Sequence, residues 1–125
     1  MVMIALVVDD DAQTLFFMEQ ALHPLDMHVL KAADGQQALD LLAQYTPQVV
    51  FLDILLPHIS GLDVLAYIAS QPQFNNTVVV ITSAHNRRQF EPEPALERAD
   101  LYLLKPVHLR HLRQAAAMAL ERQGR

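Results

Sequence analysis

The sequence LVVDDD, residues 6–11, sets three aspartates directly after an apolar run. Two more runs have the same form: VVFLD at 49–53 ends in an aspartate, and VVVITS at 78–83 ends in two hydroxyl residues. A fourth run, LYLLKP at 101–106, ends in a lysine and a proline. Continuous apolar runs of this length are typical of strands buried on both faces, as in a parallel sheet. The chain is therefore predicted to contain a parallel sheet whose strands end in polar side chains.

Between these runs, apolar residues recur at spacings of three and four, the period of a helix with one face on a sheet. With a short strand predicted at residues 27–32, strands and helices alternate along the whole chain. Because crossovers between parallel strands are right-handed, this order predicts a doubly wound, flavodoxin-like α/β fold with five strands in the order 2-1-3-4-5. Asp11 is placed to cap the first helix. The neighbouring Phe16, Phe17 and Met18 are predicted to be core or helix-packing residues.

The segment from residue 85 to residue 100 departs from this alternation because Pro92 and Pro94 lie where a fourth helix is expected. Proline is tolerated only in the first turn of a helix, so a regular helix can begin near Pro94 and extend for about five residues. The fourth helix is therefore predicted to be short or irregular. Residues 1–122 are predicted to form a single domain, with 123–125 fraying at the C-terminus.

Composition narrows the possible partners and the compartment. The chain has no cysteine, which fits a reducing cytosol. No apolar stretch approaches the ~20 residues that are needed to cross a bilayer. A net charge of −5 argues against non-specific binding to nucleic acid. The sequence thus predicts a cytoplasmic protein that binds neither membrane nor nucleic acid.

The carboxyl ends of parallel strands meet at one edge of the sheet, where open α/β sheets bind ligands. In the predicted strand order, three acids converge at the switch point, and a hydroxyl and an ammonium arrive from the next two strands. These side chains are Asp9, Asp10, Asp53, Thr82 and Lys105. Clustered carboxylates repel one another, so without a cation at least one pKa rises. Mg²⁺ relieves this repulsion and keeps waters that a phosphate can replace, so a magnesium and phosphate site is predicted at this edge.

Taken in order, these residues resemble the receiver domain of two-component response regulators, of the chemotaxis-regulator type, over nearly the whole chain. The resemblance rests on VVDD at 7–10, DILLPHISG at 53–61, VVVITS at 78–83 and YLLKP at 102–106. Each piece alone is a weak signal, whereas the ordered set at these spacings is a strong one.

The resemblance implies that Asp53 is the phosphoacceptor, which takes a phosphoryl group from a phosphohistidine of a sensor histidine kinase or phosphotransfer protein. It implies that the cofactor is Mg²⁺, with Asp10 as a direct ligand and Asp9 acting mainly through water. Asp53 itself and the backbone carbonyl of Leu55 complete the implied metal ligands.

The resemblance also implies a phosphoryl-binding and switch set. Lys105, Thr82 and the backbone of Ser83 are expected to contact the phosphoryl group. Thr82 and Tyr102 are the implied switch pair: the threonine hydroxyl moves inward, and the vacated space lets the tyrosine turn from exposed to buried. In this family the peptide bond at the position of Lys105 and Pro106 is commonly cis.

Four further residues complete the expectations. Pro57 and Gly61 are predicted to set loop geometry, with Gly61 freeing φ before a helix. Family members tune the lifetime of the acyl phosphate at the positions of Leu55 and Ala84, and neither side chain here can hydrogen-bond an attacking water. Slow self-dephosphorylation is expected. The downstream partner is unknown, and the protein is expected to be a monomer or weak dimer.

Three other functions are compatible with parts of this pattern. A haloacid-dehalogenase-type phosphatase also uses an Asp-x-Asp after a strand. That family needs an acidic pair after the lysine, but the only acid after Lys105 is Glu121, and position 13 holds glutamine instead of threonine or valine. A flavodoxin-like cofactor binder needs a Ser/Thr/Gly-rich phosphate loop where this chain has three acids. A pseudo-receiver would keep the fold without phosphotransfer. The sequence favours a signalling domain over an enzyme, with the pseudo-receiver and the phosphatase as the alternatives.

Overall fold

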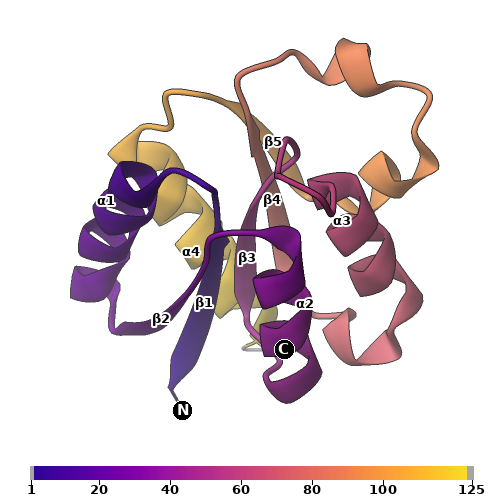
Figure 1. The fold of residues 1–125 in the computed structure, drawn as a ribbon. Helices are drawn as coiled ribbons and strands as arrows, with labels where there is room; N and C mark the ends of the chain where they lie inside the picture. The colour runs from indigo at the N-terminus through magenta and orange to yellow at the C-terminus, as the bar shows by residue number, and fades with distance from the viewer. Residues whose placement is uncertain (1, 124–125) are drawn as a thin grey trace.

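The computed structural model describes residues 2–123 and contains one sheet of five parallel strands (Figure 1). The strands lie in the order β2-β1-β3-β4-β5, so the predicted doubly wound topology is confirmed. The strands are β1 (Met3–Val8), β2 (Met27–Ala32), β3 (Val49–Asp53), β4 (Val78–Ser83) and β5 (Leu101–Leu104).

Helices α1 and α4 cover one face of this sheet, and α2 and α3 cover the other (Figure 1). The four helices are α1 (Ala12–Leu22), α2 (Gly35–Gln44), α3 (Gly61–Ser70) and α4 (Leu109–Gln123). Helix α4 includes Gln123, the first of the three residues that were predicted to fray. The other two lie outside the described residues.

Each face of the sheet has its own apolar core, which explains the unbroken apolar runs in the three central strands, β1, β3 and β4. On the α2/α3 face, Leu52 and Ile81 pack with residues such as Leu65. On the α1/α4 face, Phe51 and Val80 pack with residues such as Met18 and Leu112. Successive residues of β3 and β4 thus enter opposite cores, the alternation expected of a strand.

The start of α1 follows the sequence prediction, but its aromatic residues do not. Asp11 caps the helix, and its side chain accepts a hydrogen bond from the Gln13 backbone N–H. Met18 is buried as predicted. The prediction for Phe16 and Phe17 is wrong: these side chains are 63% and 45% exposed. The buried stripe of α1 contains Met18 and Leu22. At 3.6 residues per turn, Phe17 lies about 100° and Phe16 about 200° around the helix from Met18, so both side chains point away from the core.

In place of a fourth regular helix, two short 3₁₀ helices connect β4 to β5, as the prolines predicted. They are η3 (Arg87–Phe90) and η4 (Pro94–Arg98), and both lie in the orange segment that arches away from the sheet in Figure 1. Pro94 occupies the first position of η4, and Leu96 is fully buried in the α2/α3 core. The segment is therefore attached to the core through side-chain packing, without a long run of helical hydrogen bonds.

The C-terminal end of this segment is fixed by Asp100. Its carboxylate accepts hydrogen bonds from the Val79 backbone N–H at 2.8 Å, from Arg98 at 3.2 Å and from Arg122 at 3.1 Å. Both arginines also donate to the carbonyl oxygen of Thr77. One carboxylate thus joins η4, α4 and the beginning of β4.

Gly61 is needed for space, not for an unusual φ. The expectation that it frees φ is wrong, because its φ is not positive. A Cβ at this position would lie 2.0 Å from the Asp53 carbonyl oxygen and 2.7 Å from the Ile54 Cα. The Gly61 N–H donates to the Ile54 carbonyl at 2.8 Å, so the first turn of α3 lies against the end of β3.

Replacing Gly61 with alanine should therefore lower the free energy of unfolding by about 3 kcal/mol, because the backbone of β3 cannot move without disturbing Asp53. Chemical denaturation measures this change. Gly35→Ala is the milder substitution for comparison. Its Cβ would meet Ile59 atoms at 2.6 Å or more, so it should lower the free energy of unfolding by less. A Gly61→Ala protein as stable as Gly35→Ala would contradict the steric explanation.

Candidate functional site

Strand alternation directs four polar side chains to the α1/α4 side of the carboxyl edge. Each lies two residues after a strand residue that packs in the α1/α4 core, and side chains at i and i+2 share a face. The four pairs are Val7 and Asp9, Phe51 and Asp53, Val80 and Thr82, and Leu103 and Lys105. The same periodicity that fills this core therefore also assembles the site.

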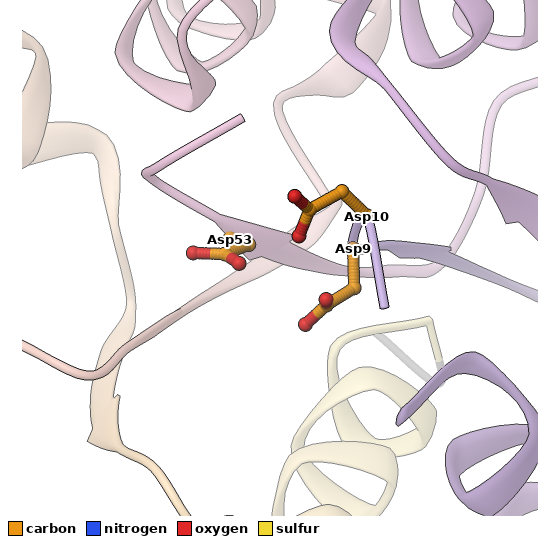
Figure 2. A group of neighbouring side chains, drawn as sticks. All are labelled: Asp9, Asp10 and Asp53. Atoms are coloured by element: carbon orange, nitrogen blue, oxygen red, sulfur yellow. The ribbon is translucent and has the colours of Figure 1, made fainter. Parts of the chain in front are cut away.

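Three carboxylates gather where β1 and β3 end (Figure 2). Each of Asp9, Asp10 and Asp53 offers an oxygen within 4.8 Å of the others. Asp9 and Asp53 are buried and Asp10 is exposed. Three hard oxygen donors with one side open to water fit Mg²⁺, which takes one or two carboxylates and keeps several waters. The predicted acidic cluster is confirmed as a group that could hold a divalent ion.

Lys105 supplies the positive charge between the two buried acids. Its Nζ donates to Asp9 Oδ2 at 2.7 Å and to Asp53 Oδ2 at 2.9 Å. The remaining oxygens accept from backbone groups: the Asp11 N–H bonds Asp9 Oδ1 at 2.9 Å, and the Leu55 N–H bonds Asp53 Oδ1 at 3.1 Å. Each oxygen of the two buried carboxylates thus has a donor.

Burial and charge act in opposite directions on these groups. Burial raises the pKa of Asp53, aided by the charge of Asp9 and opposed by the hydrogen bond from Lys105, and the outcome is a raised value. Burial alone would lower the pKa of Lys105, but its hydrogen bonds to Asp9 and Asp53 outweigh burial and raise it. Asp53 is therefore ionised at a free-energy cost that Lys105 offsets only in part.

Asp53→Asn should stabilise the metal-free protein by several degrees at neutral pH, because it removes a buried charge. A carboxyl with a raised folded-state pKa destabilises the fold while it is ionised. The gain should shrink as the pH falls through the raised pKa of Asp53, and vanish below about pH 4, where the unfolded chain is also protonated. Thermal unfolding in a chelator from pH 3 to pH 8 measures both effects.

The matched control is Asp40→Asn, which changes an exposed carboxylate on α2 and should move the midpoint little at any pH. An Asp53→Asn protein that is less stable than the parent at neutral pH would contradict the cost of the buried charge.

A cleft of about 610 Å³ opens beside the acids, between α1 and the loop that follows β5. Thr82 is buried at its base next to Lys105, and Phe17 and Val107 line its apolar side. The Lys105–Pro106 peptide bond is cis, as the resemblance implied.

Tyr102, for which the resemblance implies a switch role, lies elsewhere. Tyr102 packs against the α2/α3 core, and its hydroxyl donates to the His85 carbonyl at 2.7 Å. Leu55, Pro57 and Ala84 are exposed in the loops that follow β3 and β4. The structure therefore groups Thr82 with the acids and Lys105, and leaves Tyr102 on the opposite face of the sheet.

The resemblance implies a role for the Ser83 backbone and none for its side chain, which the structure places in a hydrogen bond. Ser83 is fully buried, and its Oγ accepts a hydrogen bond from the His85 N–H at 3.0 Å. Serine hydroxyls can bond a backbone N–H two residues further on, so a serine at the end of a predicted strand is the sequence signal of such a turn.

Comparison with known proteins identifies the family. Residues 5–117 match the response regulator receiver domain family. The chain is 32% identical over 119 residues to the transcriptional regulatory protein PrrA of Mycobacterium tuberculosis, which covers 95% of this chain and 50% of PrrA. It is 33% identical over 105 residues to a probable cyclic di-GMP phosphodiesterase of Vibrio cholerae, covering 83% of this chain and 23% of that protein. The chain belongs to the response regulator receiver domain family.

A solved structure agrees with this result. The signal receiver domain of an HD domain-containing protein from Pseudomonas fluorescens Pf-5 superposes with a TM-score of 0.87 at 28% identity, covering 99% of this chain and 98% of that one. The chain spans half or less of the two longer relatives, so their whole-protein activities belong to them.

Family membership settles the class of function. The chain is a signalling receiver domain of the two-component type, and the phosphatase and flavodoxin-like readings are not favoured. Receiver domains of response regulators are phosphorylated by histidine kinases and bind Mg²⁺ at an acidic cluster, which here corresponds to Asp9, Asp10 and Asp53. Within residues 2–123, no helix combines the length and hydropathy that a membrane span requires.

Proposed function

We propose that Asp53 accepts a phosphoryl group from a phosphohistidine on a sensor histidine kinase or a phosphotransfer protein. A carboxylate oxygen of Asp53 forms the new bond to phosphorus, and the phosphorus–nitrogen bond of the donor breaks. Its electron pair stays on the imidazole nitrogen, which takes a proton from water. The product is an acyl phosphate. The observation that supports this proposal is the place of the Asp53 carboxylate, which is bonded to Lys105 and lies within a metal-binding group of acids.

The residues around Asp53 act by positioning and charge compensation. Asp9, Asp10 and the backbone carbonyl of Leu55 would hold Mg²⁺ together with Asp53. When bound, the ion supplies positive charge to the phosphoryl oxygens. Lys105 already donates to Asp53, so its ammonium is within reach of a group added there.

Two further groups would contact the phosphoryl oxygens. These are the Thr82 hydroxyl and the Ser83 backbone N–H, which lie at the end of β4 beside β3. Thr82 pairs directly with Asp53 across these two strands. The proposed acceptor and the proposed hydroxyl contact are therefore neighbours in the sheet.

Intact-mass measurement tests the acceptor. The parent protein, incubated with Mg²⁺ and a small phosphodonor, should gain one phosphoryl group that base removes. Asp53→Asn should gain none, since it lacks the carboxylate that forms the acyl phosphate, and a chelator should abolish the adduct on the parent. Steady phosphate release without an adduct would instead indicate a phosphatase, and an unreactive parent protein would indicate a pseudo-receiver.

The acyl phosphate is proposed to be long-lived for this family, so that the domain acts as a phosphoacceptor and not as a turnover enzyme. Hydrolysis needs a water that is oriented for attack on phosphorus. Leu55 follows Asp53 by two residues and is 50% exposed, and Ala84 follows Thr82 by two and is also exposed. An aliphatic side chain at each position offers the water no hydrogen bond.

Leu55→Asn should accelerate loss of the phosphoryl group several-fold, because the amide can orient the attacking water. The time course of the adduct by intact mass, after removal of the donor, measures this rate. Leu120→Asn is the matched control, since it makes the same substitution on α4 at a leucine that is 62% exposed, and its rate should equal that of the parent. Loss of the adduct from the parent within seconds would contradict slow hydrolysis.

The output is proposed to pass through protein contacts in the cytoplasm, without nucleic acid or membrane as direct partners of this domain. The surface that responds is proposed to contain the segment with η3 and η4, strand β5 and helix α4. Because that segment lacks a regular helix, pairing of two copies through it is proposed to be weak, and the domain to be a monomer or weak dimer.

A further inference from the structure

The two residues of the proposed switch lie on opposite faces of the sheet. Thr82 lines the cleft beside Lys105 together with Met18, which belongs to the α1/α4 core. Tyr102 packs against the α2/α3 core and pairs in register with Ile81 of the same core. We call the carboxyl ends of β1, β3 and β4, with the acids, Thr82 and Lys105, the phosphorylation edge. A change there must therefore cross β4 to reach Tyr102.

Ser83 is the residue of β4 that is placed for this crossing. It follows Thr82 directly in the chain, and strand alternation directs its side chain to the α2/α3 face. It is fully buried, and its Oγ accepts from the His85 N–H at 3.0 Å. Ser83 thus belongs to the phosphorylation edge through its backbone and to the face of Tyr102 through its hydroxyl.

The backbone of His85 connects Ser83 to Tyr102. Its N–H donates to Ser83 Oγ, and its carbonyl accepts from Tyr102 Oη at 2.7 Å. The His85 ring also lies edge-on to the Phe90 ring, with centroids 6.3 Å apart. Two side-chain hydroxyls from β4 and β5 therefore hold the first residues of the segment that replaces a regular helix.

We propose that the Ser83 hydroxyl is a positioning group that couples the phosphorylation edge to Tyr102 through the backbone of His85. A shift of β4 at Thr82 moves Ser83, which moves the His85 N–H and, through the same residue, the carbonyl that holds Tyr102. This inference rests on the proposed function, because it assigns a route by which phosphorylation of Asp53 reaches Tyr102 and the surface of β5. The route uses hydrogen bonds in place of direct contact between the Thr82 and Tyr102 side chains.

Hydrogen exchange of the His85 amide, followed by NMR in the free protein, tests the link. Ser83→Ala removes the acceptor and should raise the exchange rate about fivefold, the factor that one ordinary hydrogen bond is worth. Ser83→Thr keeps a hydroxyl and should restore slow exchange. Tyr102→Phe should also raise the rate, although this amide bonds to Ser83 and not to the tyrosine. An unchanged rate in Tyr102→Phe would overturn the coupling.

The second measurement follows Tyr102 itself. Mg²⁺ with beryllofluoride, a mimic of the acyl phosphate, should shift the Tyr102 ring signal in the parent protein. At saturation this shift should be smaller in Ser83→Ala and close to parental in Ser83→Thr, a rescue that a purely structural serine would not require. A full shift in Ser83→Ala would overturn the proposal, because Tyr102 would then respond without the hydroxyl.

The chain offers matched controls in α3. The Ser70 hydroxyl donates to the Tyr67 carbonyl at 2.8 Å, so Ser70→Ala removes a comparable bond, and Tyr67→Phe removes a comparable hydroxyl. Both should leave the His85 exchange rate and the Tyr102 shift at parental values, and a change in either would overturn the specific role of Ser83. Failure of the proposed function is seen separately, as the absence of a phosphoryl adduct on the parent protein.

Discussion

The ammonium of Lys105 between Asp9 and Asp53 is the interaction on which the site depends. Two buried carboxylates near each other are unfavourable, and a single cation that bonds both makes the arrangement possible. The same ammonium ties the end of β5 to the ends of β1 and β3, so the charge balance also fixes the edge of the sheet. Any added phosphoryl group enters a place where positive charge is already positioned.

The fold and the core of the site could be read from the sequence because one periodicity encodes both. Apolar runs define the strands, and the alternation of side chains in each strand continues into Asp9, Asp53, Thr82 and Lys105. The strand order, the cap at Asp11 and the irregular fourth helix follow from local rules. These features depend on residues that are close in the chain or aligned at one edge.

What the sequence could not provide depends on contacts between distant segments. The need for Gly61 comes from the carbonyl of Asp53, and φ was the wrong explanation. The exposure of Phe16 and Phe17 depends on how far α1 is rotated on the sheet, which the composition of one helix does not determine. The hydroxyl of Ser83 matters because Tyr102 approaches the same residue, His85, from another strand.

The carboxylate of Asp100 gives the segment between β4 and β5 two unequal ends. Near η4, three donors converge on that one side chain and Leu96 is buried, whereas near His85 two single hydroxyls hold the chain. Local opening occurs where the fewest contacts must break. Opening of the segment should therefore begin at its His85 end, which follows directly on Thr82 and Ser83, while the Asp100 end beside α4 stays closed.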